Sequence, residues 1–214
     1  TRLAELWRRA DRVRQENVGG EVHLRGLIEL SNYCVRLCGY CGLRAANRRL
    51  QRYRMTADEV MACVGRAVDF GYGTVVLQSG EDPKLTCDEV SALIERIKTE
   101  TTLAVTLSLG ERSDEELAAW REAGADRYLL RFETSNAELY RRIHPPREGE
   151  TNQPERPRLA ILEVLRSLGY EVGSGVMIGI PGQSYEVLAR DIGLFREMDL
   201  DMIGVGPYIS NPAA

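Results

Sequence analysis

The feature that most constrains the fold is a regular alternation between short apolar segments and longer segments of helical periodicity. Six short segments, each near-continuously apolar or small, are predicted to be β-strands: residues 24–30, 74–78, 104–109, 128–133, 173–180 and 202–209. Between them, apolar residues recur at the spacing of amphipathic helices. Buried strands separated by helices are typical of a parallel sheet, so we expect an α/β fold of the (β/α) TIM-type barrel class.

Two of the predicted helices carry a clear start signal. Thr56 and Ser113 stand where an N-cap residue belongs, and Glu59 and Glu116 follow three residues later. A hydroxyl residue followed at this spacing by glutamate forms a capping box, in which each side chain bonds the backbone of the other. Both helices are therefore predicted to begin at these positions.

The chain is predicted to hold one core that stops short of a closed barrel. We assign residues 1–20 to an N-terminal helix and residues 21–214 to the core. A segment rich in proline and charge, residues 145–157, is predicted to be a surface loop. No helical segment follows the sixth strand, whereas parallel strands need helices on their outer face. We therefore expect a partial or truncated barrel of about six strands.

Charge and hydropathy exclude several classes of function. The chain has 28 basic and 32 acidic residues and a net charge of −4, which gives no general attraction to nucleic acid or to an anionic membrane. No stretch approaches the roughly 20 apolar residues that span a bilayer. We expect a cytoplasmic protein with a small-molecule substrate. The cysteines do not resemble a disulfide framework, and Cys63 and Cys87 are predicted to be packing residues.

The strongest local motif is a cluster of three cysteines. Cys34, Cys38 and Cys41 are spaced CxxxCxxC in the loop that leaves the first predicted strand. Thiolates this close in sequence can converge on an iron–sulfur cluster or on zinc. Structural zinc needs a fourth ligand, and the histidines, His23 and His144, are distant in sequence. A cubane cluster with three protein ligands leaves one iron open to an exogenous molecule, whereas three buried structural thiols fit a polar, glycine-containing turn poorly.

With its βα pattern, this cysteine loop resembles the radical S-adenosylmethionine (SAM) superfamily. Tyr40 matches the aromatic residue that this family places before the last cysteine, near the adenine. Residues 79–82, Ser-Gly-Glu-Asp, are similar to the family segment that holds the methionyl amine. Longer strings, at residues 25–32, 52–56, 77–83, 106–111 and 125–131, resemble the HydE family of FeFe-hydrogenase maturases. Biotin synthase and methylornithine synthase belong to the same subgroup.

The resemblance implies roles for individual residues. Cys34, Cys38 and Cys41 would ligate a 4Fe–4S cluster, and the amine and carboxylate of SAM would chelate the open iron. Arg158 would bind the SAM carboxylate, with Arg156 as the alternative. Ser108 or the strand at residues 175–179 would line the adenosyl group, and Glu133 would bond the ribose. The residues expected to bind SAM are Tyr40, Ser79, Gly80, Glu81, Ser108, Glu133 and Arg158.

A second set resembles the substrate-facing positions of HydE, on strands that would point into the barrel. These candidate catalytic residues are Arg25, Gln78, Thr106, Arg127, Arg131 and Met177. Cationic and amide groups there suit an anionic or carboxylate-bearing ligand. Structural ion pairs and satisfied core polar groups are the competing interpretation. One position departs from the pattern, because Phe132 stands where HydE sequences often have histidine.

The resemblance implies a radical SAM enzyme that cleaves SAM reductively to a 5′-deoxyadenosyl radical. A HydE-like enzyme would act on an organometallic precursor in assembly of the di-iron subcluster of the FeFe-hydrogenase H-cluster. It would need a reductant such as ferredoxin or flavodoxin and would work with other hydrogenase maturases. The alternatives are a methylornithine-synthase-like enzyme with a small amino-acid-derived substrate, a non-catalytic iron–sulfur scaffold, and a zinc module. No cysteine pair near the C-terminal end supports a second cluster.

Overall fold

A computed structural model describes residues 1–146 and 157–214. Its centre is one sheet of six parallel strands in the order of the sequence, from β1 to β6. The strands are β1 (Gly26–Ser31), β2 (Thr74–Ser79), β3 (Ala104–Ser108), β4 (Arg127–Leu129), β5 (Glu171–Ile178) and β6 (Met202–Pro207). All six predicted strands are therefore confirmed, and β1 and β6 are not paired with each other in the described residues. The open α/β sheet is consistent with a partial TIM-type barrel.

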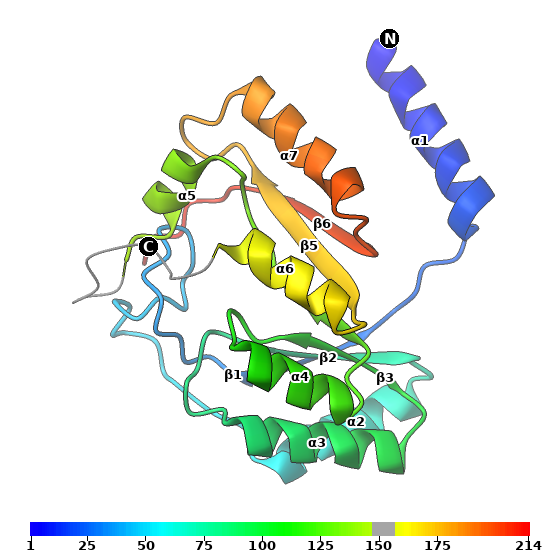
Figure 1. The fold of residues 1–214 in the computed structure, drawn as a ribbon, viewed down its shortest axis with the longest axis vertical. Helices are drawn as coiled ribbons and strands as arrows, with labels where there is room; N and C mark the ends of the chain where they lie inside the picture. Colours follow the sequence, from blue (N-terminus) through cyan, green and yellow to red (C-terminus); the bar gives the residue numbers. More distant parts are fainter. Residues whose placement is uncertain (147–156) are drawn as a thin grey trace.

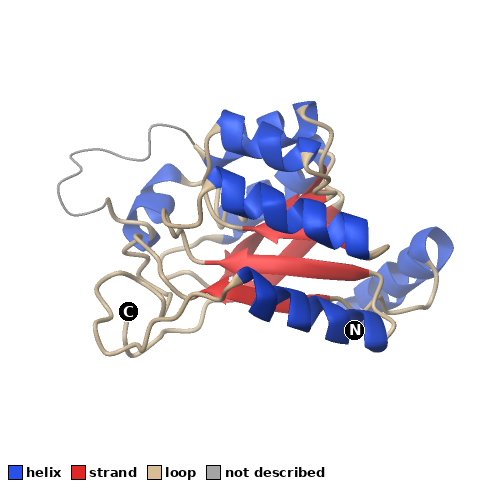
Figure 2. Ribbon diagram, turned by 90° about the horizontal axis from the view of Figure 1, so that it is seen from below, coloured by secondary structure: helices blue, strands red, loops and turns tan. Residues whose placement is uncertain are grey.

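Helices connect the strands and cover one face of the sheet. They are α1 (Arg2–Val18), α2 (Ala57–Asp69), α3 (Cys87–Glu100), α4 (Asp114–Glu122), α5 (Ala137–Ile143), α6 (Arg158–Ser167) and α7 (Tyr185–Glu197). In Figure 1, α1 stands apart from the sheet, and none of its residues is buried. Figure 2 shows the strand arrows pointing to a cluster of loops, where the chain's C-terminal end also lies. None of the described helices is long and apolar enough to cross a membrane.

The period-two pattern of the central strands separates a helix-covered face from an inner face. Val75, Leu77, Val105 and Leu107 are fully buried and belong to the main hydrophobic core with the helices. The residues that alternate with them point to the opposite side of the sheet, because successive side chains on a strand alternate. The sheet therefore offers a polar inner face, which the predicted substrate residues on β2 and β3 share.

The predicted helix starts are confirmed. Thr56 and Ser113 each accept a hydrogen bond from the backbone N–H three residues later, and the glutamate at that position bonds back to the cap. Thr86 forms a third capping box at the start of α3. Each box satisfies backbone groups that the first helical turn leaves unpaired, which fixes where the helix begins and how long the preceding loop is.

Several strand boundaries differ from the sequence prediction, most of all the end of the fourth strand. The fourth strand ends at Leu129 rather than at residue 133, although an isolated bridge still pairs Glu133 with Val176. The N-terminal helix, Arg2–Val18, lies within the segment 1–20 predicted for it. Most of the predicted surface loop, together with Arg156, lies outside the described residues. The division into an N-terminal helix and a core stays a prediction.

Candidate functional site

The three motif cysteines lie in the irregular segment between β1 and α2, at the carboxyl end of the sheet. All are free thiols, and Cys38 is the most deeply buried. Burial raises the pKa of Cys38 to about 12, although the nearby Arg158 guanidinium acts in the opposite direction. The pKa of Cys34 is also raised, chiefly by burial. The CxxxCxxC spacing keeps all three thiols within one loop.

Backbone contacts hold the cysteine loop against the neighbouring loops. The Val35 N–H donates to the Glu81 carbonyl at 3.0 Å, and the Gly39 N–H donates to the Ile143 carbonyl at 2.8 Å. Gly80 permits the first contact, since a Cβ there would lie 2.3 Å from the Tyr33 carbonyl oxygen. Such an approach is open only to glycine. The β2 loop and the end of α5 therefore fix the cysteine loop from two sides.

The donor set fits an iron–sulfur cluster better than a single metal ion. In the described part of the chain, no group of three or more His, Cys, Asp or Glu side chains is gathered closely enough for one ion. Structural zinc brings all four ligands to within about 2.3 Å of one centre. A 4Fe–4S cluster binds each thiolate on a different iron and therefore needs a wider arrangement. Cys34, Cys38 and Cys41 would each bind one of three irons in such a cluster, which stays a prediction.

Beside the cysteines lies a network of two carboxylates and two guanidinium groups. Arg36 binds Glu81 through Nε and Glu111 through Nη2, both at 2.5 Å. Arg158 Nε lies 2.8 Å from Glu111 Oε1, and Arg158 Nη2 lies 3.9 Å from Glu81 Oε1. The four side chains are only 10–11% exposed. Burial raises the pKa of Glu81, with Glu111 acting in the same direction and Arg36 and Arg158 against it.

Sequence reasoning missed two members of this network, Arg36 and Glu111. Arg36 lies inside the CxxxCxxC spacing, and Glu111 follows Gly110 after β3 as Glu81 follows Gly80 after β2. The repeated glycine–glutamate pair at adjacent strand ends was the available signal. Parallel strands bring their carboxyl ends to the same edge, so both glutamates reach one site.

Arg158, at the start of α6, is the predicted carboxylate-binding arginine, and it lies in this network. Its Nη1 donates to the Arg131 carbonyl at 2.7 Å, and its guanidinium lies 5.8 Å from the centre of the Tyr140 ring. Bidentate geometry makes arginine well suited to a carboxylate ligand. Arg158 therefore lies where a SAM carboxylate could be bound. The binding role itself stays a prediction.

Glu133 stands out by its backbone conformation. It follows β4 with φ +63°, a left-handed conformation that residues with a Cβ rarely adopt. Its side chain is buried, at 5% exposure. Burial raises the pKa of its carboxyl group. Oε1 accepts from the Tyr40 hydroxyl at 3.5 Å, and Oε2 lies 3.2 Å from Arg131 Nη2. Left-handed conformations in non-glycine residues cluster at functional sites, so this buried carboxylate is a strong binding candidate.

The Ser79–Asp82 segment is anchored by its last residue. Asp82 accepts from the Ser31 hydroxyl at 2.6 Å and from Arg54 Nε at 2.7 Å. Burial acts to raise the pKa of Asp82, but the Arg54 and Ser31 hydrogen bonds outweigh it and hold this pKa below its usual range. The Ser79 hydroxyl donates to the Gly80 carbonyl at 2.6 Å. Asp82 thus ties the segment to the end of β1.

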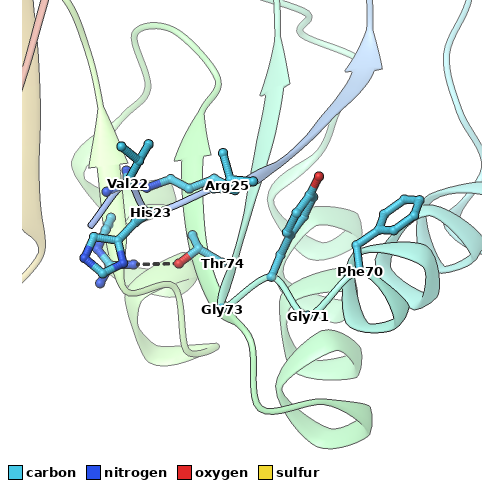
Figure 3. A pocket seen from close by; sticks show the side chains of 10 residues that line it. Val22, His23, Arg25, Phe70, Gly71, Gly73 and Thr74 are labelled. Carbon is cyan, nitrogen blue, oxygen red and sulfur yellow. Dashed lines mark hydrogen bonds between the residues drawn. The ribbon is translucent and has the colours of Figure 1, made fainter. Parts of the chain in front are cut away.

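Two predicted substrate residues lie at the opposite, amino end of the sheet. Arg25 precedes β1 and donates to the Met202 sulfur at 2.9 Å, and Arg127 begins β4 and forms an ion pair with Glu171. Figure 3 shows the hollow that they line with His23, where Arg127 also bonds the Thr74 hydroxyl at 3.3 Å. The structure does not bring these arginines to the cysteine loop.

The other four predicted substrate residues lie on the inner face or near the carboxyl end. Gln78 pairs in register with Ser108, the predicted adenosyl contact on β3. Thr106 is 1% exposed, and its hydroxyl has no hydrogen-bond partner in the described structure. Arg131 donates to the Val176 carbonyl at 2.7 Å. Met177 packs in a small cluster whose neighbours include the Tyr40 ring.

The strand expected to line the adenosyl group is rich in glycine, and strand pairing explains one of these glycines. A Cβ at Gly175 would lie 1.9 Å from the Gly204 carbonyl oxygen, so close pairing of β5 with β6 requires glycine there. A ligand is therefore not needed to explain this residue. The predicted ligand contact of the strand remains untested.

Comparison with known proteins agrees with this geometry. A profile of the radical SAM superfamily matches residues 28–195. The chain is 48% identical over 207 residues to the [FeFe] hydrogenase maturase subunit HydE of Thermotoga maritima, covering 97% of this chain and 58% of that protein. It is 26% identical to 3-methylornithine synthase of Methanosarcina acetivorans, with coverage of 97% and 57%. The chain therefore spans less than two thirds of these relatives.

Solved structures share the fold. Methylornithine synthase superposes with a TM-score of 0.88 at 27% identity, covering 98% of this chain and 60% of that one. A structure of HydG, a maturase of the [FeFe]-hydrogenase, gives a TM-score of 0.81 at 23% identity, with coverage of 97% and 48%. The cysteine motif, the open parallel sheet and the profile match lead to one conclusion. This chain belongs to the radical SAM superfamily, whose members are enzymes that use a 4Fe–4S cluster and S-adenosylmethionine.

Proposed function

We propose that the chain forms the catalytic core of a HydE-type radical SAM enzyme that acts in assembly of the FeFe-hydrogenase H-cluster. One observation carries the proposal: three free cysteines and a buried carboxylate–guanidinium network meet at the carboxyl end of one parallel sheet. This is the edge at which α/β barrels build their active sites. The 48% identity to a HydE maturase supports the specific type.

Different residues would bind the iron–sulfur cluster and SAM. Cys34, Cys38 and Cys41 would hold the cluster and leave one iron without a protein ligand. The bound cluster would supply the single electron for reductive cleavage of SAM to methionine and a 5′-deoxyadenosyl radical. Arg158 would orient the SAM carboxylate by charge-assisted hydrogen bonds, and Glu81 would hold the amine. These contacts fix the reacting carbon relative to the inner face.

The inner face is proposed to receive the substrate. Gln78 and Thr106 offer polar groups there, and the buried Thr106 hydroxyl has no partner in the described structure. Buried polar groups without partners carry a free-energy cost, and a bound ligand relieves it. A small or organometallic, carboxylate-bearing substrate fits this chemistry. The sheet and its helices would exclude water, which protects a reactive carbon radical.

The proposal includes further partners. A cluster at this site needs an external one-electron donor, for which ferredoxin and flavodoxin are candidates, and a HydE-type enzyme would cooperate with other maturases. A cytoplasmic location is part of the same proposal. Nucleic acid and membrane are not proposed as partners, because the net charge of −4 gives no general attraction to either.

A methylornithine-synthase-like reaction on an amino-acid-derived substrate is the second candidate. Its structural support is the 0.88 TM-score to methylornithine synthase. Phe132, which favours this candidate in the sequence, is 1% exposed and its ring lies 5.9 Å from the Phe195 ring of α7. Phe132 therefore packs in the core toward a covering helix, and its difference from HydE sequences has a packing explanation.

The test is complementation in a hydrogenase-producing host that lacks its own HydE, combined with an assay of 5′-deoxyadenosine. We expect active hydrogenase to be restored by the protein and lost with Cys38→Ala. Formation of 5′-deoxyadenosine without complementation would contradict the maturase assignment and favour the second candidate. A protein that forms no 5′-deoxyadenosine and does not complement the host would contradict radical SAM chemistry.

A further inference from the structure

His144 occupies an unusual position at the edge of the proposed SAM site. It caps the C-terminal end of α5 and is 9% exposed. Its ring stacks on Tyr140, with centroids 4.4 Å apart and planes at 24°, and meets the Tyr40 ring edge-on at 5.4 Å. Burial lowers the pKa of His144 to about 2, and the neighbouring Arg158 and Arg36 add to this effect, so the ring is neutral. Two tyrosines therefore fix a neutral imidazole in one orientation.

A chain of polar atoms runs from this imidazole to Glu133. His144 Nε2 lies 3.0 Å from the Tyr40 hydroxyl, which in turn lies 3.5 Å from Glu133 Oε1. The Tyr40 ring also packs on the cluster formed by Leu139, Ile143, Met177 and Ile180. The hydroxyl thus has little freedom to reach other partners.

The direction of donation along the His144–Tyr40–Glu133 hydrogen bonds follows from the carboxylate at one end. A carboxylate only accepts, so the single Tyr40 hydroxyl proton is directed to Glu133, and His144 Nε2–H donates to the tyrosine oxygen. This tautomer leaves Nδ1 as a bare acceptor, in agreement with its lack of a hydrogen-bond partner in the described structure. The opposite direction would place two sets of lone pairs, on Tyr40 and Glu133, against each other.

We propose that His144 is a positioning residue that orients Glu133 for a ribose hydroxyl of SAM, acting through the Tyr40 hydroxyl. Oε1 is held from one side by tyrosine, and Oε2, which lies 3.2 Å from Arg131 Nη2, has a second lone pair with which it can accept from the ligand. The left-handed backbone of Glu133 limits how its side chain can swing, so the two constraints define one geometry. The inference rests on the proposed function, because it concerns the same SAM site.

The Gly39–Ile143 backbone bond explains why a histidine on α5 can control a residue in the cysteine loop. This 2.8 Å bond joins the residue before Tyr40 to the residue before His144. The bond joins the two segments directly beside the Nε2–hydroxyl contact. Loss of the imidazole would release the hydroxyl without removing the backbone link.

The experiment measures how strongly the protein prefers a ribose hydroxyl, by anaerobic calorimetric binding of SAM and of its 2′-deoxy and 3′-deoxy analogues. A hydrogen bond to a charged group gives a preference of about tenfold or more. We expect His144→Phe, which keeps a stacked ring, to reduce this preference to about threefold or less at unchanged iron content. His144→Gln retains an amide donor at similar reach and should restore most of it.

Tyr40→Phe is the second variant and the safeguard if His144→Phe does not fold. It should lower the hydroxyl preference to the same level, and combining it with His144→Phe should add nothing further. Tyr185→Phe, an exposed tyrosine on α7, is the matched control and should retain the full preference. Because the ratio compares ligands in one protein, a general loss of packing or cluster does not change it.

Several results would overturn the inference. One is an unchanged preference in His144→Phe or Tyr40→Phe, and another is a His144→Gln variant no better than His144→Phe. A wild-type protein that binds SAM without any hydroxyl preference would also overturn it while leaving the proposed function intact. Absence of SAM binding in the iron-loaded wild type would instead contradict the proposed function itself.

Discussion

Arginines lie at both ends of the sheet, but their burial and their partners differ between the two ends. At the carboxyl end, the side chains of Arg36 and Arg158 are 11% and 10% exposed and share two equally buried glutamates. At the amino end, Arg25 is exposed and Arg127 pairs with the half-exposed Glu171. Buried charges are costly unless paired, whereas exposed pairs contribute little. The comparison indicates that the carboxyl end is organised at an energetic cost for ligand binding.

The largest effect is expected from removing a cluster ligand at the carboxyl end. Cys34→Ala should reduce bound iron to background and lower 5′-deoxyadenosine formation by at least about 100-fold, because even second-shell changes at metal sites cost about 10–100-fold. Cys63→Ala, on α2, is the matched control and should retain both. Iron analysis after anaerobic reconstitution measures the first quantity. Iron retention in Cys34→Ala would contradict the ligand assignment.

The next effect concerns the buried network. Glu111→Gln leaves Arg36 and Arg158 without one of their two carboxylates, and breaking a buried pair costs about 3–5 kcal/mol. Urea unfolding of the variant should show a loss of this order. Glu115→Gln, exposed on α4, should change the free energy of unfolding by less than about 0.5 kcal/mol. Equal effects from the two variants would mean that the network is not coupled to stability.

Asp82 gives a smaller effect with a defined pH dependence. Asp82→Asn should destabilise the protein by about 1.5–3 kcal/mol at pH 7, the range for hydrogen bonds to charged groups. The folded pKa is below the usual value, so this stabilisation is complete above the unfolded pKa and disappears as pH falls through the folded pKa. Urea titrations of both proteins should therefore converge at acidic pH. A stability difference that grows on acidification would show that folding does not lower the Asp82 pKa.

The smallest effect is expected at the amino end. Arg127→Gln removes an ion pair with a half-exposed partner and should cost less than about 1 kcal/mol of unfolding free energy. SAM affinity should change less than about twofold, because Arg127 lies at the end of the sheet opposite the cysteine loop. Calorimetric titration with SAM checks this value. A tenfold loss of SAM affinity would remove the distinction between the two ends.

Local patterns were sufficient for most of the fold. The strands follow from apolar runs, and the starts of α2 and α4 follow from capping residues three positions apart. Both signals lie within a few residues of the structure that they specify. The predicted end of β4 was wrong because Leu130 and Phe132 continue the apolar pattern past Leu129, whereas Glu133 has a left-handed backbone that no local pattern indicates.

The candidate site was predictable in its motif residues and, through the family resemblance, at Glu133 and Arg158. Arg36 and Glu111 are 75 positions apart in the chain, and Tyr40 and His144 are 104 apart, so their contacts depend on tertiary packing. One feature was available but unused: Arg25 and Arg127 lie at the amino ends of their predicted strands, whereas the site residues follow theirs. Position relative to the strand end separates the two groups of arginines.

The central claim, that the cysteine loop and the Glu–Arg network form one cofactor site, is tested by electron paramagnetic resonance. The reconstituted protein is reduced anaerobically, and its spectrum is recorded with and without SAM, for the wild type and for Arg158→Lys. We predict a reduced-cluster signal that SAM shifts in the wild type and shifts only at higher SAM concentration in the variant. A cluster signal indifferent to SAM in the wild type would contradict the account.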